Sequence, residues 1–333
     1  MSKCLSFLFT LLLLGALGLA AAGWWINNEF KKDGVHSDIA QLPFIVESGQ
    51  GTNIIAKNLH KRGFIEHPFI FTFGVRAFQN HTRLKAGEYN LQPGVSPYDI
   101  MMLMVKGKTV TRNITIREGL TNFEIMALLR SQKLLEQDES ELLSEGLYLP
   151  ETYQFALGDS TDDILERMHK ALNTVLAKAW ENRAVDLPFE TKEEALVLAS
   201  IIEKETSVPS ERRRVAGVFV NRLRKAMLLQ TDPTVIYALN QGRHQNNGKG
   251  PLGRQLLRKD LKVDSPYNTY KYPGLPPTPI ANPGKASIEA AVNPEEHDYL
   301  FFVADGTGGH IFSKTLAEHN RAVARWRKIR AAQ

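Results

Sequence analysis

The sequence ALVLASIIEKET, residues 195–206, is the stretch that decides the fold of the larger part of this chain. Residues 195–202 are apolar almost all round a helix, which predicts a helix buried on every side. Glu203 and Glu205 follow beside this apolar surface. Glu205 lies three residues after Ile202 and four after Ile201, so it falls on the apolar stripe. Glu203 lies about 200° away around the axis at 100° per residue, so the two carboxylates do not share a face.

The chemistry that this pattern favours is proton transfer by Glu205. A carboxyl group on a buried stripe loses its water, and desolvation raises its pKa. A carboxyl that keeps its proton near neutral pH can act as a general acid, for example on the leaving oxygen of an acetal. The spacing alone leaves a second interpretation open, in which Glu205 pairs with one of the arginines at residues 212–214 and only satisfies a helix end.

The chain on either side of this helix is predicted to be mostly helical from residue 118 to residue 333. Helical periodicity covers residues 122–132, 161–183 and 193–206, and a further apolar stripe runs through residues 215–223. The run QTDPT at residues 230–234 interrupts this pattern, and we expect Thr234 to cap the helix that follows. The proline-rich stretch at 272–284 is interpreted as a rigid wall between ordered segments.

The preceding region, residues 42–117, mixes strand and helix patterns. Strands are expected at residues 44–46, 85–91 and 109–117, and helices at residues 52–61 and after Ser96. Short strands that alternate with helices predict a small α+β module. The whole chain is therefore placed in the α+β class, with a small module followed by a larger, mostly helical domain.

The first residues carry a separate signal. Residues 5–26, LSFLFTLLLLGALGLAAAGWWI, have no charge, and about 20 such residues are enough to cross a bilayer. Trp24 and Trp25 stand at the far end, where indole rings favour the membrane interface. We expect a short cytoplasmic start (residues 1–4), a transmembrane anchor (5–26), a polar stalk (27–41) and an extracytoplasmic body. A cleaved signal peptide, ending near the alanines at 20–22, is the competing interpretation.

Composition excludes several classes of protein. The 333 residues carry a formal net charge of +5 without a basic stripe, so we expect no nucleic-acid partner. The one cysteine, Cys4, excludes an intrachain disulfide and a cysteine-ligated zinc site. His310 and His319 have no further ligand at convincing spacing, so no metal is expected. Ser200 and Lys204 are four residues apart on a helix, but Ser200 lacks the glycines of a nucleophile elbow.

Several blocks, taken in order, resemble one known family. They are LKAGEYNL (84–91), ASIIEKET (199–206), VFVNRL (218–223), LQTDPTVIY (229–237), YNTY (267–270), GLPPTPIANPG (274–284) and FVADGTGGHIF (302–312). Together they resemble the YceG-like family of endolytic murein transglycosylases over essentially the whole chain. One departure is Thr278, at a position where the family often has glycine, and a positive φ there would strain a threonine.

The resemblance implies a function and a set of site residues. It implies a lyase that cuts the bond between N-acetylmuramic acid and N-acetylglucosamine within peptidoglycan strands, leaves 1,6-anhydro ends and thereby ends strand elongation. It also implies a LysM-like module at 42–117, a catalytic domain at 118–333 and Glu205 as the catalytic acid. We expect the cleft to be lined by Glu203, Gln230, Asp232, Asn268 and Tyr270. No cofactor is expected, and the expected partners are glycan strands, the inner (cytoplasmic) membrane and the penicillin-binding synthases, with the body in the periplasm.

Two other functions stay open at this point. A non-catalytic protein could bind peptidoglycan through the LysM-like module and serve as a scaffold for cell-wall synthases. A pyridoxal-phosphate lyase is the other alternative, because the family has been labelled as resembling aminodeoxychorismate lyase. That chemistry needs a buried Schiff-base lysine and a phosphate-binding cup, and no lysine in this sequence has that setting clearly.

Overall fold

The computed structural model describes residues 2–34, 43–139, 141–244 and 251–332. The chain forms two compact units. The first comprises Met1–Arg112 and Gln154–Asp159, and the second comprises Asn113–Tyr153 and Ser160–Gln333. Helices together with small two-stranded sheets confirm a mixed helix and strand protein that begins with one apolar helix. The limits 42–117 and 118–333 stay a prediction.

The first unit starts with the long helix α1 (Ser2–Lys31), which is long and apolar enough to cross a membrane. It includes residues 2–4, which we expected to precede the anchor. It also continues past residue 26 through the first part of the expected stalk, because Phe30 is buried in the core of this unit. The later stalk residues 35–41 lie outside the described part of the chain.

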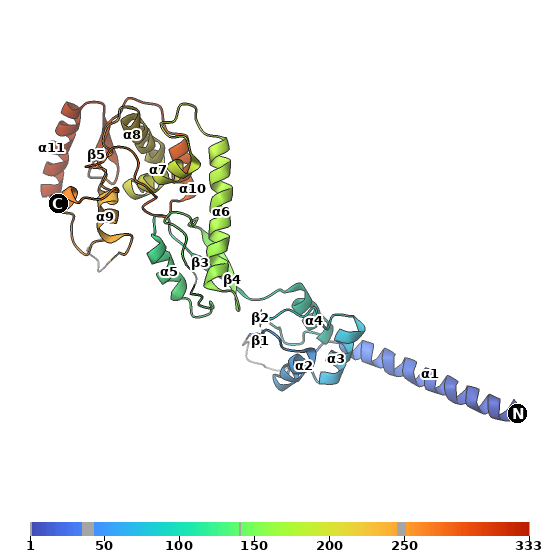
Figure 1. The fold of residues 1–333 in the computed structure, drawn as a ribbon. Helices are drawn as coiled ribbons and strands as arrows, with labels where there is room; N and C mark the ends of the chain where they lie inside the picture. Colours follow the sequence, from blue (N-terminus) through green and yellow to red (C-terminus); the bar gives the residue numbers. More distant parts are fainter. Residues whose placement is uncertain (1, 35–42, 140, 245–250, 333) are drawn as a thin grey trace. The chain divides into compact units, whose positions relative to one another are not determined.

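The rest of this unit surrounds a small core at the end of α1 (Figure 1). Its elements are β1 (Phe44–Val46), α2 (Thr52–Lys61), α3 (Pro68–Ala77), β2 (Gly87–Tyr89) and α4 (Pro97–Lys106). Strands β1 and β2 pair antiparallel with Ile45 opposite Glu88. Ser96 caps α4 as expected, since its side chain accepts a hydrogen bond from the backbone N–H of Asp99. Helix α3 was not expected from the sequence.

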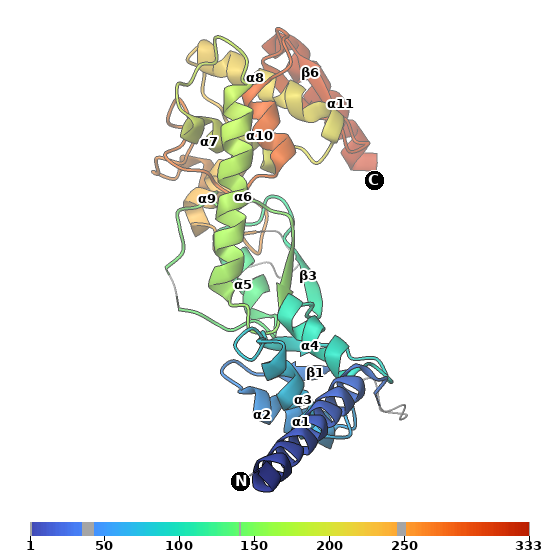
Figure 2. The same ribbon diagram turned by 90° about the vertical axis from the view of Figure 1, so that its right-hand side faces the viewer.

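The second unit is mostly helical (Figure 2). Strands β3 (Thr111–Thr115) and β4 (Thr152–Ala156) form a two-stranded sheet. The remaining elements are α5 (Asn122–Arg130), α6 (Thr161–Glu181), α7 (Lys192–Glu205), α8 (Arg212–Arg224), α9 (Asp232–Asn240), α10 (Lys285–Val292), the antiparallel hairpin of β5 (Phe301–Ala304) and β6 (His310–Ser313), and α11 (Leu316–Ala332).

Helix α7 is the centre of the second unit. Every residue from 195 to 202 is buried, as the sequence predicted, and the helix packs against α6, α8, α9 and α10. A capping box at Thr191 and Glu194 starts it, which satisfies two of the otherwise free N–H groups. Burying a single Leu or Ile side chain contributes about 1.5–3 kcal/mol, so this packing fixes the end of α7 firmly. Glu205 is the last residue of that helix.

The proline-rich stretch packs against this helix as a wall. Residues 280–283 are buried, and the backbone N–H of Ile280 donates to the hydroxyl of Ser200 at 3.0 Å. Thr278 does not have a positive φ, so its backbone is free of the strain that a positive φ would cause in a threonine. Its hydroxyl instead lies 2.7 Å from the hydroxyl of Tyr267.

Candidate functional site

Glu205 projects from the end of α7 toward the start of α9. The Thr231 hydroxyl donates a hydrogen bond to Glu205 Oε1. Thr231, and not Thr234, precedes the first helical residue, so the expected helix start was three residues late. The reason is that Pro233 lies in the first turn of α9, where a helix tolerates proline because those N–H groups have no partner within the helix.

The loop before α9 is held in place by the segment that contains YNTY. The N–H of Gln230 donates to the carbonyl of Thr269 at 3.1 Å, and the N–H of Thr231 donates to the Thr269 hydroxyl at 3.1 Å. The Tyr270 hydroxyl donates to Asp232 Oδ1 at 2.6 Å. The backbone of Gln230 has a φ of 51°, which is uncommon for a residue other than glycine. Three predicted site residues, Gln230, Asp232 and Tyr270, thus come together beside Glu205.

The surroundings of Glu205 raise the pKa of its carboxyl group. Burial raises the pKa of Glu205 above its usual range, and the nearby Asp232 carboxylate raises this pKa further. The Thr231 hydrogen bond and the charges of His310 and Arg222 act in the opposite direction. Desolvation is the largest of these effects, so the pKa of Glu205 is raised on balance. A group of this kind can donate its proton as a general acid.

A cavity of about 500 Å³ opens in front of these residues. Glu205, Gln230, Thr231, Asp232 and Tyr270 line one side of it. The other side is contributed by the hairpin and by the C-terminal helix α11, through Phe301, Phe302, Val303, Leu316, His319, Val323, Trp326 and Arg327. The cavity is therefore a polar surface that faces an aromatic and apolar surface, which is a suitable lining for a sugar ring with one polar edge.

Arg222 also lines the cavity and lies near Glu205. Arg222 falls on the apolar stripe at residues 215–223, and a long basic side chain in such a position usually reaches the rim. It is buried instead, with its guanidinium donating to the carbonyls of Leu300 at 2.7 Å and Leu229 at 2.8 Å and lying over the ring of Phe301. These backbone carbonyls satisfy the hydrogen-bond donors of the buried guanidinium. The position of Arg222 on the apolar stripe was the sequence signal that could have revealed its burial.

Glu203 and Asn268 lie outside the residues that line this cavity. Glu203 accepts a hydrogen bond from the N–H of Gly284 at 2.9 Å and lies 3.7 Å from Arg212, on the other side of α7. The Asn268 amide is fully buried and donates to the carbonyl of Val263 at 2.7 Å. The structure therefore places these two predicted cleft residues behind the walls of the cavity rather than at its surface.

The arginines that could have neutralised Glu205 bind elsewhere. Arg212 reaches Glu118 and Glu203, Arg213 donates to a backbone carbonyl, and Arg214 pairs with Glu295 at 2.9 Å. This arrangement disfavours the interpretation in which Glu205 only satisfies the end of its helix.

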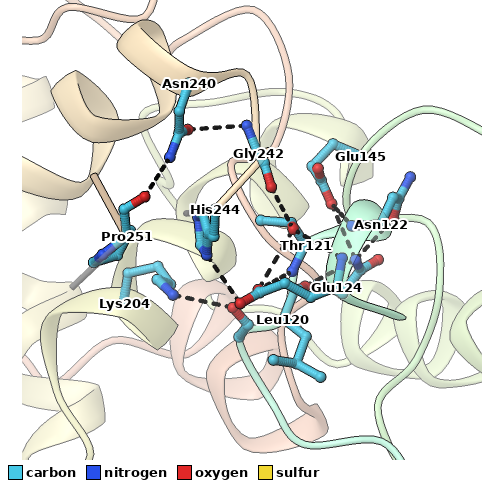
Figure 3. A network of polar contacts seen from close by, with 12 residues as sticks. Leu120, Thr121, Asn122, Glu124, Glu145, Lys204, Asn240, Gly242, His244 and Pro251 are labelled. Atoms are coloured by element: carbon cyan, nitrogen blue, oxygen red, sulfur yellow. Dashed lines mark hydrogen bonds and ion pairs between the residues drawn. The ribbon is translucent and has the colours of Figure 1, made fainter. Parts of the chain in front are cut away.

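The Ser200 and Lys204 pair does not form a nucleophile and base. The Ser200 hydroxyl donates to the carbonyl of Val197 at 2.7 Å, whereas Lys204 Nζ donates to the carbonyl of Gly119 at 3.1 Å (Figure 3). His310 is paired with Glu211, 2.7 Å from its Nδ1. Within the described ranges, no three His, Cys, Asp or Glu residues come close enough to hold a metal ion.

A polar network supports the end of α7 from behind (Figure 3). The Thr121 hydroxyl, at the start of α5, donates to the carbonyl of Gly242 at 2.7 Å, and His244 Nδ1 lies 3.0 Å from Glu124 Oε1. These contacts join the loop after α9 to the start of α5. They hold the C-terminal end of α9 in place.

Comparison with known proteins gives one consistent family. The YceG-like family model matches residues 44–325. A Bacillus subtilis endolytic murein transglycosylase is 34% identical, over 83% of this chain and 82% of that protein. A Streptococcus pneumoniae endolytic murein transglycosylase is 29% identical over 95% of this chain, which spans 64% of that longer relative. A crystal structure of a YceG-like protein from Listeria monocytogenes is 35% identical, covers 84% of this chain and 98% of its own, and has a TM-score of 0.49.

Proposed function

Since this chain belongs to the YceG-like family, we propose that it is a lytic transglycosylase that cuts peptidoglycan glycan strands within the strand. Relatives named endolytic murein transglycosylase match most of the chain. The observation that carries the proposal is Glu205, a carboxyl with a raised pKa beside a cavity large enough for sugar rings.

Glu205 serves first as acid and then as base. Its proton passes to the glycosidic oxygen that leaves with N-acetylglucosamine, while the bond from that oxygen to C1 of N-acetylmuramic acid breaks. The C6 hydroxyl oxygen of the same muramic acid then bonds to C1, and its proton returns to the Glu205 carboxylate. Water is not consumed, so the product carries a 1,6-anhydro end. Hydrolysis with inversion would need a second carboxylate about 6.5–9.5 Å away with a water between the two.

The neighbours of Glu205 have separate proposed roles. Asp232 and Tyr270, joined by their hydrogen bond, contact the sugar on either side of the scissile bond. Gln230, exposed at the edge of the cavity, contacts the strand. Glu203 and Asn268 act as positioning residues, because their hydrogen bonds hold α10 and the YNTY loop in place.

The proposed location rests on helix α1. We propose that α1 is retained as a single-pass anchor in the inner membrane and that both units lie in the periplasm. The first unit is proposed to be LysM-like and to bind glycan, because helices α2 and α3 lie between the two paired strands β1 and β2 in the sequence. A protein that ends nascent strands works where they are made, so membrane-bound peptidoglycan synthases are the proposed partners.

The products of the wild-type enzyme test this function. Purified, uncrosslinked glycan strands are incubated with the full-length chain, and the ends are identified by mass spectrometry. The expected products are internal fragments with anhydro-muramic ends. Reducing ends would indicate a hydrolase. Strand binding without any cleavage would overturn the proposal in favour of a scaffold protein.

A further inference from the structure

The last turns of α1 are packed against α3. The ring of Trp25 stacks on Phe69 with 6.5 Å between their centroids, and Phe30 stacks on Phe78 at 5.8 Å. Gly74 makes this possible, because a Cβ atom there would lie 2.4 Å from the Phe30 ring. The apolar helix thus continues into the core of the first unit without an intervening linker, and the position of α3 relative to α1 is fixed.

Helix α3 has one buried face and one exposed apolar face. Ile70, Phe71 and Val75 lie in the core, whereas Phe69 and Phe73 are 54% and 51% exposed. These two phenylalanines are four residues apart, so they form a stripe on one side of the helix. A contiguous exposed aromatic surface in a folded unit marks a contact with another apolar body.

The contact of α3 with the apolar helix α1 points to the lipid bilayer as that body. Phe69 is stacked on Trp25, six residues before the end of α1, which is about 9 Å along the helix axis at 1.5 Å per residue. The apolar part of α1 leads directly into this point, and Trp24, which is 70% exposed, lies beside it. Interfacial helices lie about 5–10 Å deep at the boundary of headgroups and acyl chains.

The charges near this surface are arranged as an interface requires. Lys31 lies over the rings of Phe78 and Tyr98, at 5.7 Å and 5.9 Å, and Arg76 is exposed on α3. Cations that flank aromatic rings occupy the headgroup level of a bilayer. The acidic residues nearby have basic neighbours: Glu29 lies 3.4 Å from Lys32, and the exposed Glu66, just before α3, lies 4.0 Å from His67.

We propose that α3 is a second membrane-contact element, with Phe69 and Phe73 inserted into the outer interface of the bilayer that α1 crosses. The first unit then rests on the membrane surface in one fixed orientation instead of moving on a flexible tether. The proposal rests on the proposed retention of α1 in the membrane, and it adds a contact that an anchor alone does not require.

Spin-label accessibility in lipid nanodiscs tests this proposal with the full-length chain. In a Cys4→Ser background, Phe73→Cys reports on α3 and Leu14→Cys on the anchor. Asn90→Cys reports on the exposed residue that follows β2, a strand that lies on the side of the unit away from α1 (Figure 1). The discs contain phosphatidylethanolamine and phosphatidylglycerol and one protein each. Each label is relaxed with oxygen, which prefers lipid, and with a nickel chelate, which prefers water.

The expected result is a graded series. Position 14 favours oxygen strongly, position 73 favours oxygen by a smaller factor as a shallow lipid site, and position 90 favours the nickel chelate. A water-like signal at position 73 together with a lipid-like signal at position 14 would overturn the α3 contact and leave the anchor intact. A water-like signal at both would overturn the anchor and the contact together. Shielding of position 73 from both reagents, with line broadening at two proteins per disc, would assign this face to a second copy instead.

Discussion

At the scale of single residues, the hydrogen bond from Thr231 to Glu205 modulates the pKa of this carboxyl group. It stabilises the charged carboxylate, so it lowers a pKa that burial raises. Glu205 must be protonated to start the reaction, and activity is therefore expected to fall as the pH rises through its pKa.

Replacement of this hydroxyl has a predictable effect on the pH profile. In Thr231→Val the carboxylate loses its donor, so the pKa of Glu205 rises and the alkaline limb of kcat/KM moves to higher pH. A hydrogen bond of about 0.5–1.5 kcal/mol corresponds to a shift of roughly 0.4–1 pH unit. Thr174→Val, on the exposed face of α6, is the matched control and keeps the wild-type profile. An unmoved limb in the Thr231 variant would contradict the assigned role of this hydroxyl.

Glu145 gives a separate prediction, on stability. Burial raises the pKa of Glu145 to about 7, although the N–H of Asn122 donates to it at 2.8 Å. Because this pKa is higher in the folded state than in the unfolded state, the folded protein binds more protons between about pH 4.5 and pH 7. The contribution of Glu145 to stability is thus largest at low pH and is lost as the pH rises to 7.

The variant Glu145→Gln removes this dependence and keeps an oxygen that can accept the same hydrogen bonds. The free energy of unfolding of the variant minus that of wild type is expected to increase by about 2 kcal/mol from pH 5 to pH 8. This value allows for solvent screening of a partly buried group. Thermal unfolding of both proteins at the two pH values measures the difference. Parallel pH dependence of the two proteins would mean that Glu145 is ionised at neutral pH in the folded state.

Sequence reasoning at the scale of helices and strands worked where local signals were strong. Helices α5, α6 and α7 begin with capping boxes, and their apolar periodicity is long. Helix α3 was missed because PFIFTFGVRA consists largely of aromatic, β-branched and glycine residues, which are weak helix formers. Its helical form depends on packing against α1, α2 and α4, and no local pattern reveals such contacts.

The contact between α1 and α3 can be tested by adding a side chain at Gly74, where the two helices lie close together. Gly74→Ala places a methyl group against the Phe30 ring, and overpacking of this kind costs about 1–3 kcal/mol. Gly23→Ala, also within a helix of this unit and with open space around it, is the control. Thermal unfolding in detergent is expected to show a lower midpoint for the first variant alone. Equal midpoints would indicate that α1 and α3 are not packed as described.

The candidate site was predicted only in part, because sequence spacing describes one helix at a time and the site is built from several. The stripe argument singled out Glu205 because a helix repeats regularly along the sequence. Thr231, Arg222 and Trp326 come to the cavity from three other helices or their caps. Their approach depends on tertiary contacts that span up to a third of the chain, which spacing cannot show. The substrate class came from the resemblance of several ordered blocks and not from any single residue.

At the scale of the whole molecule, the fate of α1 decides where the enzyme acts. Burial of Phe30 in the first unit makes the end of α1 part of the folded body, but cleavage after the alanines at 20–22 would leave Phe30 in place. Intact-mass spectrometry of protein extracted from membranes distinguishes the two cases. We expect the full 37.4 kDa chain, apart from processing of the first Met. A mature chain that begins near residue 23 would contradict the single-pass anchor.

The central claim is that one carboxyl, Glu205, carries the cleavage. The most direct measurement is the yield of anhydro-muramic ends from uncrosslinked glycan strands, compared between wild type, Glu205→Gln and Glu193→Gln, the last an exposed glutamate at the other end of α7. Circular dichroism confirms that each variant is folded. The account predicts wild-type yield from Glu193→Gln and a loss of at least a hundredfold from Glu205→Gln, the size typical of a missing general acid. An unchanged yield of anhydro ends from folded Glu205→Gln would contradict it.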